Sequence, residues 1–414
     1  MKILQFTYVL NGGAGQEVLS MHDALVKLGH ESYIVYAGKY VVDSQNNQFT
    51  LAGVSNWMGK ILRAICKFLF SFIKIDNTYA PYNLFERYMC YNAKKILDQI
   101  SFDPDIIFIK WVSGFVNARF IADLKKFSKA KIVISFIDQA PLTGGCHYPI
   151  DCLQFMNECI NCPMSKSKLF KKCIHENYKY KKRYLPNELL IMIASSGDEK
   201  LLKKSKLYTN QKILKVLPTI NSNEFKPEDK ISAKEAFDID AKKKVILCGS
   251  SNLKESRKGM SYLIEAIKLM KYKDFVLLII GNQELENIDC DVRYAGYLSK
   301  AKLIKAYQAA DVFVCPSIAD SGPMMVSQSI MTGTPVVAFP IGVSNDLVHR
   351  LLTGYRAKFC DIEDLANGVD FILSLSDEQY KKMSRNCRRL AKKKYDINNS
   401  ELSLSNLIKM IITA

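Results

Sequence analysis

The most constraining feature of the sequence is an alternation, from end to end, of short β-branched or aromatic runs with longer helical patterns. This alternation is typical of βαβ units, in which helices connect parallel strands. The predicted fold class is therefore α/β. A chain of 414 residues with 48% apolar content is too long for one ordinary core and fills two, so we expect two domains.

The apolar runs locate the strands of both halves. In the first half we expect strands at 2–9, 31–36, 106–109, 131–136 and 190–194. In the second half we expect strands at 245–247, 275–280, 292–294, 312–315 and 335–339. A stretch rich in Pro, Asn and charge near Val216 indicates a junction between domains at 1–217 and 218–395. We expect residues 396–414 to add a C-terminal helix that packs back towards the first domain.

The charge balance favours anionic partners. Lys and Arg number 58 against 41 Asp and Glu, an excess of 17, which attracts phosphorylated small molecules, anionic lipid or nucleic acid. Nucleic acid is not an expected partner, because the basic residues are dispersed and no DNA- or RNA-reading motif is present. The N-terminus lacks a signal-peptide cleavage site, and Lys or Arg interrupts every apolar run before it reaches the length of a membrane span. We therefore expect a cytoplasmic protein.

A glycine-rich turn, NGGAG at 11–15, follows the first strand and precedes a helix expected at 17–28. Glycines there let the chain turn sharply and expose backbone N–H groups, which suits an anion or a sugar hydroxyl. Gly12, Gly13 and Gly15 are therefore candidate residues for binding such a ligand. The spacing is not the dinucleotide fingerprint, and a tight turn that only packs helix on strand is the alternative.

Two cations, Arg257 and Lys258, open a helix that follows the strand KVILCGS in the second half. A guanidinium can bind phosphate oxygens in a bidentate manner and an ammonium adds a point charge, so the pair predicts a diphosphate pocket beside a helix start. Ser250, at the end of the strand, is a further candidate. A solvated basic pair on the surface is the alternative.

The segment CPSIADSGPMMVSQSIMTGTPVVAF gives the strongest context for this pocket. Pro323 at the first helical position and Gly333 after the last turn predict a helix over 323–331. Its free N–H groups are expected to meet the same diphosphate. The candidates for binding the diphosphate ligand at this helix start are Gly322, Pro323, Met324 and Met325. Asp320 and Gln328 lie eight residues apart, so both can address a ligand there.

Together, GSSNLKESRKG, YAGYLSKAKLIKAYQAADVFVCPS and PMMVSQSIMTGTPVVAFPIG resemble glycosyltransferase family 4, retaining transferases of the GT-B fold. Within that family the sequence is similar to bacterial exopolysaccharide and colanic-acid-type transferases with a TGGCHY segment, here 143–148. The resemblance implies two Rossmann-like domains facing across a cleft. It also implies a nucleotide diphosphate sugar as donor and a glycan or lipid-linked glycan as acceptor, in capsule, O-antigen or exopolysaccharide synthesis.

The resemblance also assigns roles to residues. Lys258, with Arg257, binds the donor diphosphate, and Gly12 and Gly13 form the loop over the reacting sugar. The paired glutamates of the family fall on Asp320, at the transferred sugar, and on Gln328, near the ribose hydroxyls. We expect no cofactor in catalysis: a catalytic metal is disfavoured because the donor site already has cationic and helix-end partners and the sequence shows no carboxylate-rich metal motif.

Three positions depart from the family pattern. Asp320 is one methylene shorter than Glu, and Gln328 keeps the hydrogen bonding of Glu but loses its charge. Relatives often have His-Asp where this chain has Ile137-Asp138, and we expect Asp138 to supply polarity near the sugar. The catalytic candidates are Asp320, Asp138, Lys258 and Arg257.

A cluster of cysteines at Cys146, Cys152, Cys159 and Cys162 has the pattern C-x5-C-x6-C-x2-C. Four thiolates, or three with His147, can close a tetrahedral structural zinc site that stabilises a loop with little core of its own. Reduced free cysteines and disulfides are the alternatives.

The segment WMGKILRAICKFLFSFIKI at 57–75 combines a stripe of cations with an aromatic-rich apolar helix. Such a helix suits the plane of an anionic membrane, so we expect peripheral contact with the cytoplasmic face of the inner membrane. A core helix whose cations reach the surface is the alternative.

Two interpretations from different classes remain at this point. The first is a retaining transfer of a sugar from a nucleotide diphosphate sugar. The second is a catalytically degenerate protein of the same fold that binds a membrane or a protein partner, favoured by Asp320, Gln328 and Ile137. An epimerase or phosphorylase on the same fold is a third, which the sequence resembles less.

Overall fold

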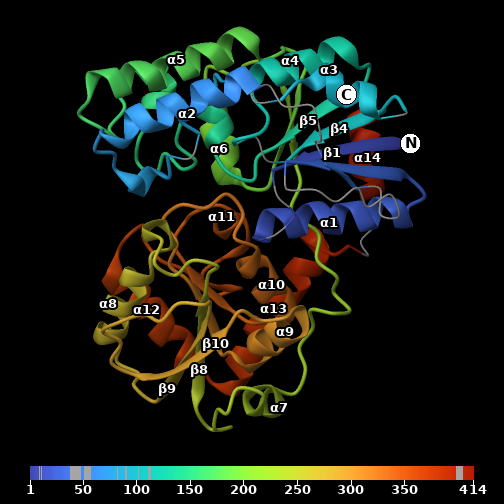
Figure 1. The fold of residues 1–414 in the computed structure, drawn as a ribbon. Helices are drawn as coiled ribbons and strands as arrows, with labels where there is room; N and C mark the ends of the chain where they lie inside the picture. The colour runs from blue at the N-terminus through green and yellow to red at the C-terminus, as the bar shows by residue number, and fades with distance from the viewer. Residues whose placement is uncertain are drawn as a thin grey trace. The chain divides into compact units, whose positions relative to one another are not determined.

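The computed structural model describes residues 1–414 except 9, 11, 38–47, 51–56, 82, 89–90, 101, 111–112 and 398–403, and the side chains of 12–14, 16 and 48–50. The chain divides into two compact units (Figure 1). The first comprises Met1–Ala194, Asp198–Val216 and Leu404–Ala414, and the second comprises Ser195–Gly197 and Leu217–Ser403. Each unit is built on one parallel sheet, which confirms the α/β fold class.

The first unit contains a seven-stranded parallel sheet in the order β3-β2-β1-β4-β5-β6-β7. The strands are β1 (Lys2–Thr7), β2 (Glu31–Tyr36), β3 (Gln48–Thr50), β4 (Ile106–Ile109), β5 (Lys131–Ser135), β6 (Leu190–Ile193) and β7 (Lys212–Lys215). Every residue of β4 and β6 is buried. Such runs are typical of strands covered by helices on both faces of a parallel sheet.

The helices of the first unit frame this sheet (Figure 1). They are α1 (Gly12–Lys27), α2 (Trp57–Ser71), α3 (Ala93–Gln99), α4 (Ala118–Phe127), α5 (Lys168–Tyr184), α6 (Ser196–Lys204) and α14 (Leu404–Ile412), with short 3-10 turns η1 (Asn77–Tyr79), η2 (Ala140–Leu142) and η3 (Gln154–Asn157). The side chains of Asn92, Asn117 and Ser167 cap α3, α4 and α5 by accepting first-turn N–H groups. α14 adds Leu407, Ile408 and Ile411 to the core of this unit.

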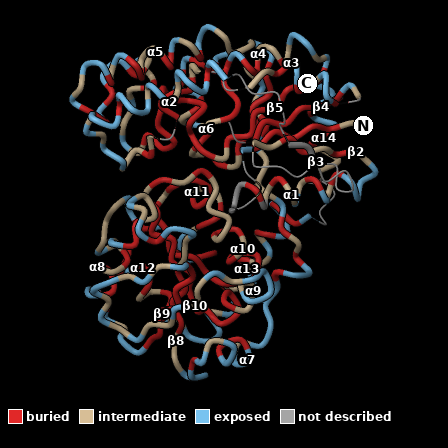
Figure 2. The backbone as a smooth tube through the Cα atoms, in the orientation of Figure 1, coloured by how far each residue is buried: buried red, intermediate tan, exposed pale blue. Residues whose placement is uncertain are grey.

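The second unit has a six-stranded parallel sheet in the order β10-β9-β8-β11-β12-β13. The strands are β8 (Lys244–Gly249), β9 (Phe275–Ile280), β10 (Asp291–Gly296), β11 (Val312–Cys315), β12 (Val336–Ala338) and β13 (Gly354–Arg356). The helices are η4 (Ser256–Lys258), α7 (Lys230–Glu235), α8 (Met260–Leu269), α9 (Lys300–Ala309), α10 (Met324–Thr332), α11 (Ser344–Leu347), α12 (Ile362–Leu373) and α13 (Asp377–Tyr395). Figure 2 shows the central strands of each sheet as buried, whereas the edge strand β10 has no buried residue.

In both parallel sheets, the direction in which the chain adds successive strands reverses at an internal strand pair, β1 with β4 and β8 with β11. In open α/β sheets, ligands bind outside the carboxyl ends of the strands at this switch point. The glycine-rich segment at 12–15 follows β1, and Ser250 follows β8. The loop that contains Asp320 follows β11. The fold therefore brings these sequence-predicted residues to the two switch points.

Two expected helix boundaries were wrong. α1 begins at Gly12 and not at Glu17, so the glycines form its first turn. A Cβ on Gly15 would lie 2.1 Å from the carbonyl carbon of Leu10, and only glycine permits that close approach. α10 begins at Met324, and Pro323 is the N-cap with ψ of 100°, outside the helical region.

None of the helices in the described ranges combines the length and the apolar character that crossing a membrane requires.

Candidate functional site

The second unit gathers opposite charges at its switch point. Lys258 Nζ lies 2.7 Å from Asp320 Oδ2, and Arg257 Nη1 lies 3.4 Å from the same oxygen. Arg257 Nε also donates to Glu255 Oε1 at 2.7 Å. The side chains of Lys258, Arg257 and Asp320 are 17%, 15% and 11% exposed. The cluster is therefore mostly buried, but a small part of each side chain can still contact solvent or a ligand.

The local backbone explains why the two cations meet Asp320. Arg257 and Lys258 lie in η4, and Gly259 then adopts a φ of 67° before α8 begins. A Cβ on Gly259 would lie 2.0 Å from the carbonyl oxygen of Pro316, so this turn packs against the loop after β11. Ile318 N donates to Arg257 O at 2.8 Å, which fixes that loop beside η4.

Asp320 is held as a carboxylate. Burial acts to raise its pKa, but the charges of Lys258 and Arg257 and the hydrogen bonds it accepts outweigh burial and hold the pKa below its usual value. Its Oδ1 accepts the N–H of Gly322 at 3.2 Å. We expected Asp320 to touch the transferred sugar, and that contact stays a prediction. In the structure, Asp320 is the shared counter-ion of Lys258 and Arg257, the two residues predicted to bind the diphosphate. The sequence did not indicate this ion pairing.

The start of α10 offers fewer donors than we expected. The N–H of Gly322 donates to Asp320, and Pro323 has no N–H. Met324 and Met325 form the first turn, whose N–H groups have no partner within the helix. A Cβ on Gly249 would lie 3.2 Å from Met325 Cε, which places this turn beside the end of β8 and hence near Ser250.

Gln328 lies in the second turn of α10 and is half-buried. Its Oε1 accepts the hydroxyl of Tyr307 at 2.9 Å, and Tyr307 is fully buried in α9. The amide therefore has its oxygen engaged and keeps its NH₂ group to donate to a ligand. The proposed ribose contact of Gln328 stays a prediction.

The first unit places a buried cation at its own switch point. Lys110, directly after β4, is 2% exposed, and its Nζ lies 2.8 Å from Glu17 Oε1 in α1. Glu17 belongs to the helix that Gly12, Gly13 and Gly15 begin, so this ion pair ties the glycine-rich turn to the end of β4. Sequence reasoning missed Lys110, which follows an all-apolar strand and has no motif around it.

A buried hydrogen-bonded chain joins three segments of the first unit. His147 Nδ1 lies 3.0 Å from Asp138 Oδ2, and His147 Nε2 lies 2.7 Å from Ser113 Oγ. Asp138 Oδ1 also accepts the N–H of Ala140 at 2.9 Å. With Nδ1 protonated towards the carboxylate, Nε2 accepts the Ser113 hydroxyl. We expected Asp138 near the donor sugar and His147 as an alternative zinc ligand; the structure pairs them with each other.

The segment at 143–148 packs against α5. A Cβ on Gly144 would lie 2.4 Å from the carbonyl oxygen of Ile174 in α5, which explains the glycine. Lys181 Nζ donates to the carbonyls of Ala140 and Thr143 at 2.6 and 2.7 Å and pairs with Glu86 at 2.8 Å. Burial raises the pKa of Glu86 despite Lys181. A single buried lysine thus anchors the loop that carries His147.

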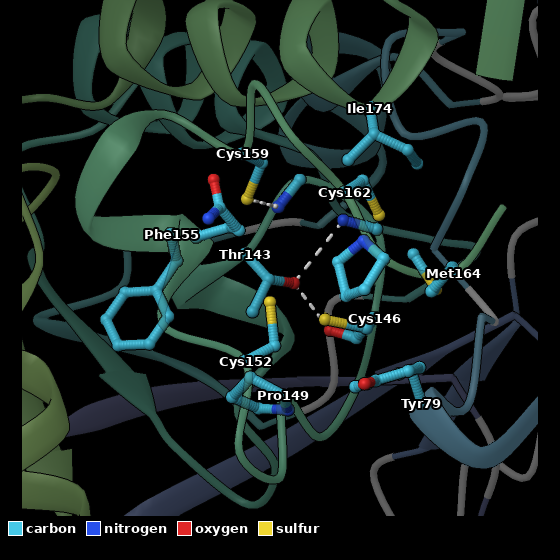
Figure 3. Close-up of a pocket in the computed structure, with 14 residues that line it drawn as sticks. Tyr79, Thr143, Cys146, Pro149, Cys152, Phe155, Cys159, Cys162, Met164 and Ile174 are labelled. Atoms are coloured by element: carbon cyan, nitrogen blue, oxygen red, sulfur yellow. Dashed lines mark hydrogen bonds between the residues drawn. The ribbon is translucent and has the colours of Figure 1, made fainter. Parts of the chain in front are cut away.

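The four clustered cysteines line one small cavity in the first unit, of about 10 Å³ (Figure 3). None forms a disulfide. Gly144 N donates to Cys159 Sγ at 3.3 Å, and the Sγ atoms of Cys152 and Cys162 accept the N–H groups of Gln154 and Met164. Burial, and secondarily the neighbouring thiols, raise the pKa of Cys159 to about 12 and of Cys162 to about 11.

Within the part of the chain that the structure describes, no three His, Cys, Asp or Glu side chains have an arrangement that could hold a metal ion. The four sulfurs share a cavity but are not positioned around one point. Zinc binding would require changes in their side-chain rotamers. Structural zinc therefore stays a prediction.

Comparison with known proteins identifies the class. The strand orders of the two sheets and the match to solved structures define an α/β protein of two Rossmann-like domains with the GT-B fold. Sucrose-phosphate synthase from Thermosynechococcus elongatus matches over 100% of this chain and 99% of its own, with a TM-score of 0.71 and 15% identity. The Anabaena protein HepE in complex with UDP-glucose matches over 100% of both chains, with a TM-score of 0.66 and 12% identity.

The match to a known protein family lies in the second unit. Residues 229–390 match the model of the family described as Glycosyl transferases group 1, so the chain contains a domain of that group. An uncharacterized glycosyltransferase of Haemophilus influenzae is 25% identical over 48% of this chain and 56% of its own length. An Escherichia coli UDP-Gal:alpha-D-GlcNAc-diphosphoundecaprenol alpha-1,3-galactosyltransferase is 28% identical over 32% of this chain and 37% of its own. The matched part of this chain thus covers 56% and 37% of the length of these two relatives.

Proposed function

We propose that the protein is a retaining glycosyltransferase of family 4 that moves a sugar from a nucleotide diphosphate sugar to a glycan or lipid-linked glycan. The observation that carries this proposal is the cluster of Lys258, Arg257 and Asp320 at the switch point of a glycosyl transferases group 1 domain. Two cations beside the first turn of a helix suit the diphosphate of such a donor.

Stabilisation of the leaving group is the main catalytic contribution in this proposal. As the bond between C1 and the phosphate oxygen breaks, negative charge grows on the departing diphosphate, and fixed cations lower the energy of that state. Asp320 holds the two like-charged side chains together. The ammonium of Lys258 has three N–H donors, of which Asp320 accepts one, and the others suit phosphate oxygens. The acceptor oxygen bonds to C1 on the same face, and its proton passes to the departing phosphate oxygen.

The remaining candidates have supporting roles. We assign Ser250, Gly322, Met324, Met325 and Gln328 to the nucleotide end of the donor, because they surround the start of α10.

In the first unit, the turn at Gly12, Gly13 and Gly15 covers the reacting sugar. Asp138 acts through His147 and orients Ser113, which makes Asp138 a positioning residue rather than a group that touches the sugar.

The choice of donor and acceptor class is supported by relatives rather than by geometry. HepE was solved with UDP-glucose, and the Escherichia coli relative uses UDP-Gal with a diphosphoundecaprenol-linked acceptor. We propose a UDP-sugar donor and a lipid-linked acceptor, with a place in the synthesis of capsule, O-antigen or exopolysaccharide at the cytoplasmic face of the inner membrane.

A donor panel tests the proposal. Purified protein is mixed with UDP-, GDP- and ADP-sugars, and thermal shift and slow donor hydrolysis are measured. One donor should stabilise the protein, and Lys258→Ala should abolish the shift and lower kcat/KM about 100-fold. Lys254→Ala, an exposed lysine of the same loop, is the matched control and should behave as wild type.

The outcome decides between two functions. A shift that survives Lys258→Ala would place the donor elsewhere. The absence of a shift with every donor would favour the alternative, a degenerate GT-B protein that binds a membrane or a partner; the replacement of both family glutamates by Asp320 and Gln328 is the specific observation in favour of that alternative.

A further inference from the structure

One helix of the first unit exposes an unusual amount of apolar surface. In α2 and the residue after it, Phe72, Trp57 and Phe68 are 76%, 68% and 65% exposed. The other large apolar side chains that α2 exposes are Met58, Ile61, Leu62, Ile65 and Leu69. Large contiguous apolar patches on soluble proteins mark interaction sites.

These side chains occupy one sector of the helix. At about 100° per residue, the eight positions fall within an arc of about 140°. Gly59 and Phe70, the buried residues of α2, fall outside that arc. The apolar sector is therefore separate from the face that packs on the unit. A surface helix usually buries its apolar face, whereas α2 turns its larger apolar face to solvent.

α2 is firmly fixed to its unit. The ring of Phe70 packs against Phe85 and Phe170 at centroid distances of 5.4 and 5.7 Å. Arg63 Nη1 donates to the carbonyl of Gly114 at 3.2 Å. These contacts hold the buried face of α2 on its unit, with α5 alongside (Figure 1).

Cations border the apolar sector. Lys60 and Lys67 are exposed and project from the helix between the buried face and the apolar sector, and Lys74 follows two residues after Phe72. Lys168 and Lys172 in α5 are exposed on either side of Phe170 in the sequence. No Asp or Glu occurs from 57 to 75. Positive charge beside exposed aromatic groups complements an anionic lipid surface better than a protein groove.

We propose that α2 is a membrane-docking surface, which lies in the plane of an anionic bilayer with Trp57, Phe68 and Phe72 among the acyl chains and Lys60 and Lys67 at the phosphates. Trp has an apolar body and a polar N–H, which suits the boundary between the two layers. This docking requires neither a donor nor an acceptor, so it stands whether or not the protein transfers a sugar.

Vesicle flotation of the full chain tests the proposal. Vesicles of phosphatidylcholine alone are compared with vesicles that contain 30% phosphatidylglycerol, a composition chosen for the assay. We expect binding to the anionic vesicles, and Phe68→Ser with Phe72→Ser should weaken it at least about tenfold because the buried apolar area is lost. Leu269→Ser with Tyr297→Ser, at exposed positions of the second unit, is the matched control and should bind as wild type.

Two double variants, each with two lysines changed to glutamate, separate the electrostatic contribution to vesicle binding from the apolar one. Lys60→Glu with Lys67→Glu should reduce binding to anionic vesicles more than Lys381→Glu with Lys382→Glu, which makes the same change of net charge on α13. Added salt should weaken wild-type binding, because exposed charges are screened.

Two results would overturn the proposal. One is equal binding by wild type and the Phe68/Phe72 variant. The other is a chain that ignores vesicles but dimerises in light scattering and becomes monomeric in that variant, which would show that a second copy covers α2. Circular dichroism of each variant checks the fold, which these exposed positions should not disturb.

Discussion

The two units have the same strand order around their switch points, but they use buried ion pairs in different ways. In the second unit, Lys258 and Asp320 are partly accessible. In the first, Lys181 and Glu86 are 2% and 5% exposed, and Asp138 and His147 are almost as buried. The comparison teaches that one scaffold supports two designs. The second unit keeps its charged side chains accessible to a ligand, whereas the first unit uses buried charged side chains to hold a loop in place.

Zinc gives the largest expected difference between the units. The first unit gathers four cysteines around one cavity, whereas Cys248, Cys315 and Cys387 of the second lie in separate elements, β8, β11 and α13. We expect about one zinc per chain by mass spectrometry of the metal content, with a binding free energy on the order of 10 kcal/mol, as in small zinc domains. Chelation should then increase hydrogen exchange at 143–164 and leave the second unit unchanged.

The matched variants for zinc are Cys159→Ser with Cys162→Ser, and Cys360→Ser in the second unit. The first should lose the metal, and the second should keep it. Protein purified without metal, and with unchanged exchange in chelator, would show that the thiols are simply reduced and buried.

Lys181→Met should produce the next largest effect. It removes the partner of buried Glu86 and the donor to two carbonyls, and breaking a buried ion pair costs about 3–5 kcal/mol. The free energy of opening, measured by hydrogen exchange of β4 to β6, should fall by that amount, while β8 to β12 keep theirs. Lys179→Met, at an exposed site on α5, is the control. Equal losses in both variants would contradict the role of Lys181.

Asp320→Asn should have a smaller effect that depends on pH. The pKa of Asp320 is lower in the folded protein than in the unfolded chain. Its carboxylate therefore stabilises the second unit fully at pH values above the ordinary pKa of an aspartate, and this stabilisation is lost as the pH falls through the folded pKa. At neutral pH the variant should lose about 2 kcal/mol, because two cations lose a charged hydrogen-bond partner. Thermal melts of both proteins from pH 7 to pH 3 should converge; a constant difference would contradict the ion pairing.

The strands that the sequence predicted well are those with apolar runs. The bounds of β2, β4, β9 and β11 agree with the predicted ones because β-branched and aromatic residues fill these strands. The edge strands β3, β7 and β13 were missed, because each has only three or four residues and β7 and β13 carry Lys or Arg. Edge strands lie partly in solvent and need no continuous apolar signal.

Within the candidate sites, the sequence indicated residues but not their pairing. A basic pair at a helix start, the loop before the next helix start and a family resemblance indicated Arg257, Lys258 and Asp320. The ion pairs among them depend on the contact between η4 and the loop after β11. Ser113 and His147 meet only because β4 and β5 are neighbours in the sheet. Such pairings over long sequence separations leave no local signal.

The helix α14 has a consequence for how the chain is made. Its Leu407, Ile408 and Ile411 complete a core cluster with Ile3, Leu25 and Ile106, although the whole second unit separates them in sequence. Domains usually fold in the order of synthesis, with the N-terminal one first. Here the core of the first unit is complete only after α14 has been made, so residues 217–403 of the second unit are synthesised before the first unit can bury its full apolar cluster.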